Sequence, residues 1–259
     1  MNIKAYVRVI RPKQWTKNVF VFAGLLFDKA YTDAELVLSA GLTFIAFCLV
    51  AGAIYVINDI ADRESDSRHE YKRRRPIAAG QISPAAAYVY AFFLAFSGAA
   101  LGSWVSLEVL VILALYGVMN LAYSMGLKHV VILDVFIIAT GFLLRILAGT
   151  VGIGMEPSEW LFLCSICLTL FLGFGKRRAE LQDLIESDGP PGEQRSVLQH
   201  YDPVTLDALM ASVAGCTIVS YGLFAMSDAT VAEHGTRALV YTLPFVMYAM
   251  FRFFYMVHK

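Results

Sequence analysis

Three aspartates lie close together directly after an uncharged, apolar run over residues 36–57. Asp59, Asp62 and Asp66 are spaced three and four residues apart, so on one continuous helix they share a face, whereas Glu64 points away from it. Mg²⁺ prefers one or two carboxylates together with waters and the oxygens of a substrate phosphate. The spacing therefore predicts a catalytic magnesium site made of Asp59, Asp62 and Asp66, without Glu64.

A basic segment, Lys-Arg-Arg-Arg-Pro over residues 72–76, follows the aspartates. Guanidinium and ammonium groups beside a magnesium site suit a substrate that carries a diphosphate, because they neutralise its negative charge. Arg73 and Arg75 would also serve membrane topology without touching a substrate, so both interpretations stay open. The order of acid and then base, at the end of an apolar run, predicts a magnesium-diphosphate site at a membrane surface.

The composition indicates an integral membrane protein. Hydrophobic residues make up 58% of the chain and charged residues 16%, with a mean hydropathy of +0.61, which is more apolar surface than a soluble domain buries. Eight spans of roughly 20 residues are predicted. They cover residues 15–30, 36–57, 84–103, 109–127, 130–150, 159–175, 205–226 and 237–257. The expected fold is all-α, a polytopic transmembrane helical bundle in which residues 1–259 form a single domain.

The distribution of positive charge predicts the orientation in the membrane. All of the 21 lysine and arginine residues except Lys29, Arg145 and Arg237 fall on one side of the predicted bundle. The positive-inside rule assigns that side to the cytoplasm. The two long loops, 58–83 and 176–204, both lie there. We therefore expect a protein of the inner (cell) membrane, with an active-site cavity that faces the cytoplasm beneath these loops.

The second long loop begins with Lys176 and Glu180, which are four residues apart and share a helical face with Asp183. Two interpretations remain open for them, an ion pair at a helix end or contact with substrate or metal. A second pair, Asp134 and Arg145, is separated by eleven residues, about three helical turns, so one face that points into the bundle should carry both. A buried structural role and a catalytic role both fit that pair.

Four motifs resemble the UbiA superfamily of intramembrane prenyltransferases. They are Asn-Asp-x-x-Asp-x-x-x-Asp over 58–66, Lys-Arg-x-Arg-Pro-Ile-x-x-Gly over 72–80, Tyr-Ser-x-x-Leu-Lys over 123–128 and Gly-Phe-Leu-Leu-Arg-Ile-Leu-Ala-Gly over 141–149. Residues 11–18 and 175–181 resemble the decaprenyl-phosphate phosphoribosyltransferase branch. The resemblance covers nearly the whole chain. It implies nine spans, one more than the eight predicted.

The resemblance implies an enzyme that transfers 5-phosphoribose from 5-phosphoribosyl 1-diphosphate to a polyprenyl phosphate, with Mg²⁺ as cofactor and diphosphate as product. The implied substrate-binding residues are Lys17, Asn58, Arg73, Arg75, Tyr123, Lys128, Lys176 and Glu180. Most aromatic prenyltransferases of the superfamily carry a second Asp-x-x-x-Asp where this chain has Lys176 and Glu180. A lysine at that place suits two phosphate-bearing substrates, since another carboxylate would repel them. The acceptor phosphate has a second pKa of about 6 and needs no strong base.

Two other functions fit parts of the same pattern. Prenyl transfer from an isoprenyl diphosphate to an aromatic acceptor would use the same magnesium site, but it does not explain Lys176. A transporter for an anionic metabolite would require broken helices near the bilayer midplane or an internal repeat, and the sequence gives no clear sign of either. Nucleic acid is not an expected partner. Homo-oligomerisation and the chain length of the lipid stay open.

Overall fold

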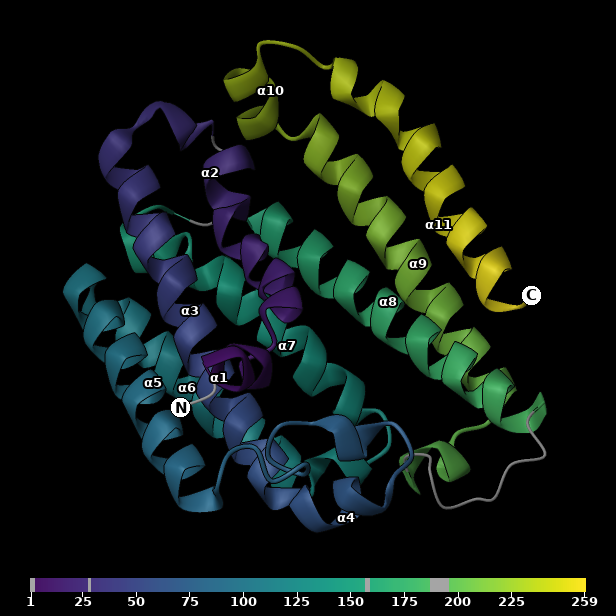
Figure 1. Cartoon of the computed structure of the whole chain (residues 1–259). Helices are drawn as coiled ribbons and strands as arrows, with labels where there is room; N and C mark the ends of the chain where they lie inside the picture. The colour runs from purple at the N-terminus through teal and green to yellow at the C-terminus, as the bar shows by residue number, and fades with distance from the viewer. Residues whose placement is uncertain (1–2, 28, 157–158, 187–195) are drawn as a thin grey trace. The chain divides into compact units, whose positions relative to one another are not determined.

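The computed structural model describes residues 3–27, 29–156, 159–186 and 196–259, and throughout these ranges the regular structure is helical (Figure 1). The contacts divide the chain into two compact units. Unit 1 comprises Met1–Met125 and Leu144–Glu156, and unit 2 comprises Gly126–Leu143 and Pro157–Lys259. The all-α prediction is confirmed.

Unit 1 is built around the long apolar helix α3 (Ala34–Ala61), which packs against α5 (Pro84–Val105). Its elements are α1 (Ile3–Val9), η1 (Pro12–Phe22), α2 (Ala23–Phe27), η2 (Ala30–Thr32), α3 (Ala34–Ala61), α4 (Arg63–Arg68), η3 (Lys72–Arg74), α5 (Pro84–Val105), α6 (Leu107–Met125), the end of α7 (Leu133–Ala148) and η5 (Val151–Ile153). Asp33 caps α3 by accepting hydrogen bonds from the amides of Glu35 and Leu36. Helix α3 packs along α5, where a side chain at Gly98 would come within 2.7 Å of Val50 Cγ2.

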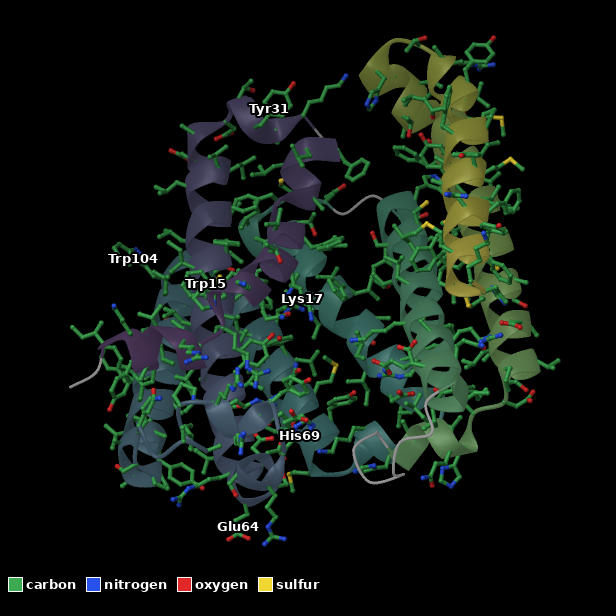
Figure 2. All side chains as sticks on the ribbon, turned by 45° about the vertical axis from the view of Figure 1, so that its right-hand side comes forward. Trp15, Lys17, Tyr31, Glu64, His69 and Trp104 are labelled. Atoms are coloured by element: carbon green, nitrogen blue, oxygen red, sulfur yellow. The ribbon has the colours of Figure 1, made fainter. Side chains whose placement is uncertain are left out.

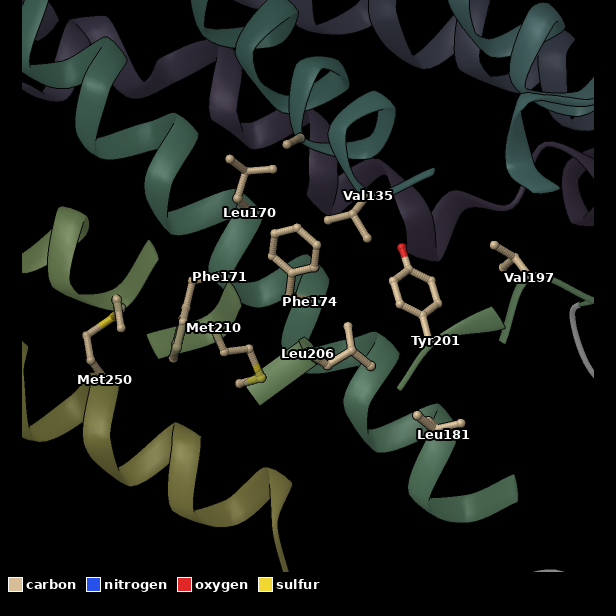
Figure 3. Packing of buried hydrophobic residues seen from close by; sticks show 12 residues of the cluster. Val135, Leu170, Phe171, Phe174, Leu181, Val197, Tyr201, Leu206, Met210 and Met250 are labelled. Carbon is tan, nitrogen blue, oxygen red and sulfur yellow. The ribbon is translucent and has the colours of Figure 1, made fainter. Parts of the chain in front are cut away.

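Unit 2 is a layer of long helices, in which α8, α9 and α11 lie side by side (Figure 1). Its elements are η4 (Leu127–His129), the start of α7, α8 (Glu159–Glu186), η6 (Ser196–His200), α9 (Pro203–Met226), α10 (Asp228–His234), η7 (Ala238–Thr242) and α11 (Leu243–Val257). Asp202 caps α9, which begins at Pro203, a position where the missing N–H costs nothing. The apolar core of unit 2 contains Phe171, Phe174, Leu206 and Met210 (Figure 3).

In the described ranges, six helical segments are long and apolar enough to cross a membrane. They are Ala34–Ala61, Pro84–Val105, Leu107–Met125, Leu133–Ile153, Pro203–Met226 and Ala238–Val257. Six such segments are the mark of an integral membrane protein. The predicted span 159–175 forms the first part of α8, which continues into polar sequence and is not among the six.

The predicted span 15–30 does not form one helix of membrane-spanning length. Its described residues up to 27 lie in the 3₁₀ helix η1 (Pro12–Phe22) and the short helix α2 (Ala23–Phe27), and η2 begins at Ala30. The preceding Arg11 has a left-handed backbone, with φ 51° and ψ 65°, which separates this segment from α1. The segment packs closely within unit 1, because a side chain at Gly149 would collide with the backbone of Val21.

The predicted orientation can be tested by cysteine labelling. Ser65 and Ala229 both have exposed side chains, so a cysteine at either position should react with a reagent that reaches its side of the membrane. We expect labelling of Ser65→Cys from the cytoplasm and of Ala229→Cys from outside. A third position, Glu193, belongs to the second loop and should label with Ser65, although it lies outside the described residues. Each variant is compared with the parent, which contains four cysteines. Opposite labelling of Ser65→Cys and Glu193→Cys would contradict a common cytoplasmic side for the two loops.

Candidate active site

Two buried aspartates and two arginines form the charged centre of unit 1. Asp59, in the last turn of α3, and Asp66, in α4, each expose only 3% of their side chain. Arg75 joins them, with Nη1 at 3.3 Å from Asp59 Oδ1 and 2.6 Å from Asp66 Oδ2. Arg11 Nη2 donates to Asp59 Oδ1 at 2.5 Å. The four side chains balance two negative charges with two positive charges in a place where unpaired carboxylates would be costly.

A break between two helices positions the aspartates differently from the continuous helix that the sequence predicted. Helix α3 ends at Ala61, and Asp62 has φ −86° and ψ 2° before α4 begins at Arg63. The expectation of one helix through Asp66 is therefore wrong. The amide of Asp62 still donates to the carbonyl of Asn58, so the chain turns without losing the hydrogen bonding of the helix end.

The break gives the three aspartates different surroundings. Arg75 binds Asp59 and Asp66, whereas the half-buried carboxylate of Asp62 forms no hydrogen bond or ion pair within the described residues. Glu64 is exposed and projects away from the unit (Figure 2). Asp62 is thus the aspartate of the motif whose carboxylate is not already engaged by an arginine.

Both arginines precede a proline, which restricts their backbone. Arg75 is extended, with φ −66° and ψ 141°, and follows η3 so that its side chain returns over α3 and α4. Arg11 adopts the left-handed conformation, and its guanidinium lies 5.0 Å from the centre of the Tyr55 ring. Sequence reasoning noted Arg11 as a basic residue of a family motif but did not place it in the site. Its position before Pro12, which parallels that of Arg75 before Pro76, was the available signal.

The other predicted site residues of unit 1 differ in burial. Asn58 is half-buried in the last turn of α3, and Tyr123 is half-buried on α6. Lys17, on η1, and Arg73, in η3, have exposed side chains. Among the residues predicted to bind substrate, Arg75 forms ion pairs with Asp59 and Asp66.

The carboxylates of unit 1 have the donor chemistry that Mg²⁺ requires, but they do not form a preassembled three-ligand cluster. Within the described ranges, no three His, Cys, Asp or Glu side chains converge in a metal-binding arrangement. Asp59 and Asp66 instead have arginine partners, since Arg11 and Arg75 both bind Oδ1 of Asp59 and Arg75 also binds Oδ2 of Asp66. Mg²⁺ needs only one or two carboxylates, and Asp62 is the aspartate of the motif that no arginine of the described residues binds.

In unit 2, a buried arginine near the start of the predicted second loop (residues 176–204) binds two carboxylates. Arg177, 1% exposed, donates from Nε to Asp134 Oδ2 at 2.6 Å and from Nη1 to Glu180 Oε2 at 2.6 Å. Lys176 is 63% exposed, and its Nζ lies 3.7 Å from the other oxygen of Glu180. The predicted pairing of Lys176 with Glu180 is therefore present as a weak contact, while the stronger partner of Glu180 is Arg177. Sequence reasoning missed this role of Arg177.

Asp134 and Arg145 are both buried, as the shared helical face predicted, yet they have different partners. Asp134 accepts hydrogen bonds from Arg177 and from the hydroxyl of Tyr201, the latter at 2.6 Å. Arg145 donates from Nε to Asn18 at 2.8 Å and from Nη2 to the hydroxyl of Tyr116 at 2.9 Å. Three helical turns keep the two charges apart, so each is satisfied within its own unit.

The fold and the aspartate motif define a class of protein. The model of the UbiA prenyltransferase family matches residues 18–259, and the chain belongs to this family. Solved structures agree on the fold. A UbiA homolog from Archaeoglobus fulgidus bound to GPP and Mg²⁺ aligns over 97% of this chain and 86% of its own, with a TM-score of 0.73 at 14% identity. A structure of digeranylgeranylglyceryl phosphate synthase aligns over 99% of this chain and 94% of its own, with a TM-score of 0.70 at 19% identity.

Three curated relatives at 34–37% identity carry the same name. The decaprenyl-phosphate phosphoribosyltransferase of Mycolicibacterium smegmatis is 37% identical over 87% of this chain and 71% of its own length. The enzyme of that name from Corynebacterium glutamicum is 34% identical over 90% of this chain and 69% of its own. The corresponding protein of Mycobacterium tuberculosis is 34% identical over 86% of this chain and 74% of its own.

Proposed function

We propose that this protein is a polyprenyl-phosphate phosphoribosyltransferase, which moves 5-phosphoribose from 5-phosphoribosyl 1-diphosphate to a polyprenyl phosphate and releases diphosphate. The observation that carries the proposal furthest is the 37% identity, over 87% of the chain, to a protein named decaprenyl-phosphate phosphoribosyltransferase. We further propose that the reaction takes place at the cytoplasmic face of the cell membrane, where the basic loops are expected.

The charged centre of unit 1 suits the diphosphate of the donor. In the proposed complex, Asp62 together with Asp59 or Asp66 would hold Mg²⁺. When bound, the ion would supply positive charge to the leaving diphosphate as the glycosidic C–O bond breaks. Arg11 and Arg75 expose 33% and 29% of their side chains, so each can reach a bound anion while it remains anchored beside Asp59. Charge-assisted hydrogen bonds from guanidinium to phosphate would orient the donor.

The predicted second loop of unit 2, which begins at Lys176, suits a reaction between two anionic substrates. The Nζ of the exposed Lys176 lies 3.7 Å from Glu180, which is a weak contact. A phosphate can therefore replace Glu180 as the partner of this ammonium group at little cost in free energy. Lys128, in η4, supplies a second, half-buried cation. Each of these positive groups can lower the electrostatic cost of holding a substrate phosphate. An acceptor that is already an anion needs no general base.

The reaction is tested with purified protein, labelled 5-phosphoribosyl 1-diphosphate and polyprenyl phosphates of several chain lengths. We expect a labelled lipid product and an equal amount of diphosphate, both abolished by a chelator and restored by Mg²⁺. In a parallel experiment the donor is an isoprenyl diphosphate and the acceptor a phenolic acid. Prenylation of the phenol, with no diphosphate released from the ribosyl donor by any lipid phosphate, would replace the proposal with aromatic prenyl transfer.

Lys176→Ala should reduce phosphoribosyl transfer because it removes an exposed ammonium group that we assign to phosphate recognition. A charge-assisted contact is worth roughly 1.5–3 kcal/mol, which corresponds to a loss of about ten- to a hundredfold in kcat/KM for the ribosyl donor. Steady-state kinetics with varied donor measure it. Arg237→Ala, which removes another exposed cation of unit 2, serves as the matched control and should leave kcat/KM unchanged. Equal kinetics for the Lys176→Ala and parent proteins would remove Lys176 from the site.

A further inference from the structure

A strained turn in unit 2 lies between Lys128, a predicted substrate-binding residue, and the start of α7. Ile132, in this turn, has φ 69°, a left-handed conformation that a β-branched side chain strongly disfavours. Its side chain is 38% exposed, so packing of that side chain does not explain the strain. Backbone strain of this kind persists only where surrounding contacts impose it.

Tyr201 supplies such a contact. Its hydroxyl accepts a hydrogen bond from the amide of Ile132 at 2.7 Å and donates one to Asp134 Oδ1 at 2.6 Å. The ring is packed in the core of unit 2, with the hydroxyl on the side of Val135 (Figure 3). One buried phenol thus ties the strained residue to the first turn of α7.

Asp134 is fixed from its other side. It is fully buried, and its second oxygen accepts from Arg177, which also binds Glu180. Burial, together with the hydrogen bond to Asp134, raises the pKa of Tyr201 above its ordinary value, so the hydroxyl keeps its proton. The protonated phenol donates to Asp134 and accepts from the amide of Ile132.

We propose that Tyr201 is a positioning residue, which holds the turn at Ile132 so that Lys128 is presented to a phosphate group of a substrate. Lys128 lies in η4, four residues before Ile132, and η4 packs against η6, the segment that leads into Tyr201. The inference rests on the proposed function, because it assigns Lys128 to the phosphate of either the ribosyl donor or the lipid acceptor.

The two hydrogen bonds by which the Tyr201 hydroxyl holds Ile132 and Asp134 are called the clamp below. Tyr201→Phe removes the hydroxyl and keeps the ring, so it tests the clamp directly. We expect KM to rise about tenfold for the substrate whose phosphate Lys128 binds, as the loss of an oriented contact implies, with kcat changed by less than about twofold. KM is measured separately for 5-phosphoribosyl 1-diphosphate and for the polyprenyl phosphate, which identifies the substrate. Tyr221→Phe is the matched control, since it removes a hydroxyl that lies 2.5 Å from Thr242 Oγ1 in the same unit. It should leave both KM values unchanged.

Two combined variants separate positioning from stability. In a Lys128→Ala background, Tyr201→Phe should change KM by less than about twofold, because the lysine through which it acts is gone. Ile132→Gly added to Tyr201→Phe should bring KM back to within about threefold of the parent, because glycine adopts positive φ without strain. An undiminished effect without Lys128, or no recovery with Gly, would overturn the proposal.

Hydrogen exchange tests the clamp without reference to the reaction. The amides of residues 133–135 bond to carbonyls of residues 130–132, so their exchange should accelerate at least about tenfold in Tyr201→Phe and stay at the parent rate in Tyr221→Phe. Unchanged exchange would overturn the clamp even in an active enzyme. Accelerated exchange in a protein whose parent transfers no phosphoribose would count against the proposed function and leave the clamp standing.

Discussion

Asp62→Asn is expected to remove most phosphoribosyl transfer at saturating Mg²⁺. Asp62 is the aspartate of the motif that the arginines leave free, so its carboxylate is available to the cation from the start. An amide keeps the shape of the side chain but removes the negative charge that Mg²⁺ needs. Initial rates over a range of Mg²⁺ concentrations measure the loss. They also separate weaker metal binding, which more Mg²⁺ would restore, from a lower maximum rate.

Glu64→Gln is the matched control, since it makes the same chemical change two residues away on an exposed side chain. Its rate should stay within a few-fold of the parent, because a change at an exposed site without partners has little effect. Equal losses at Asp62 and Glu64 would mean that the assignment of metal-facing and solvent-facing carboxylates is wrong.

Arg177→Met should cause the largest loss of stability in unit 2. The arginine and Asp134 are 1% and 0% exposed, so removal of the guanidinium leaves a buried carboxylate without its cation. Breaking a buried ion pair by removing one partner costs about 3–5 kcal/mol. Thermal denaturation of the protein in detergent should show a clearly lower midpoint. The same substitution also frees Glu180 from its contact with Arg177.

Arg178→Met provides the comparison for this experiment. Arg178 is the next residue of α8 and pairs with Asp207, which is 33% exposed, at 2.9 Å. Solvent can compensate a half-exposed carboxylate, so the midpoint should fall much less than for Arg177→Met. A similar fall for both variants would show that burial of the Asp134 pair does not control the stability of unit 2.

The apolar pattern alone predicted most of the fold. An uncharged run such as 36–57 has to be a helix in a membrane, since an isolated apolar segment can satisfy its backbone there in no other way. The family motifs could also be recognised from the sequence, because each of them is a contiguous run of residues. In the segment 15–30 the structure has a 3₁₀ helix followed by the short helix α2, and Val21 lies directly against Gly149. A local average of hydropathy contains neither the type of helix nor this contact.

The sequence by itself determined the all-helical membrane class, the acidic and basic motifs and the resemblance to one family, since composition and local spacing carry this information. Only the tertiary structure decided which charges meet. Arg11 reaches Asp59 across 48 positions, and Tyr201 reaches Asp134 across 67. The break at Asp62 likewise is visible only in the structure, where α3 ends at Ala61. Partner choice among buried charges depends on distance in space and on the cost of leaving any of them unpaired, and helical spacing along the chain does not specify either.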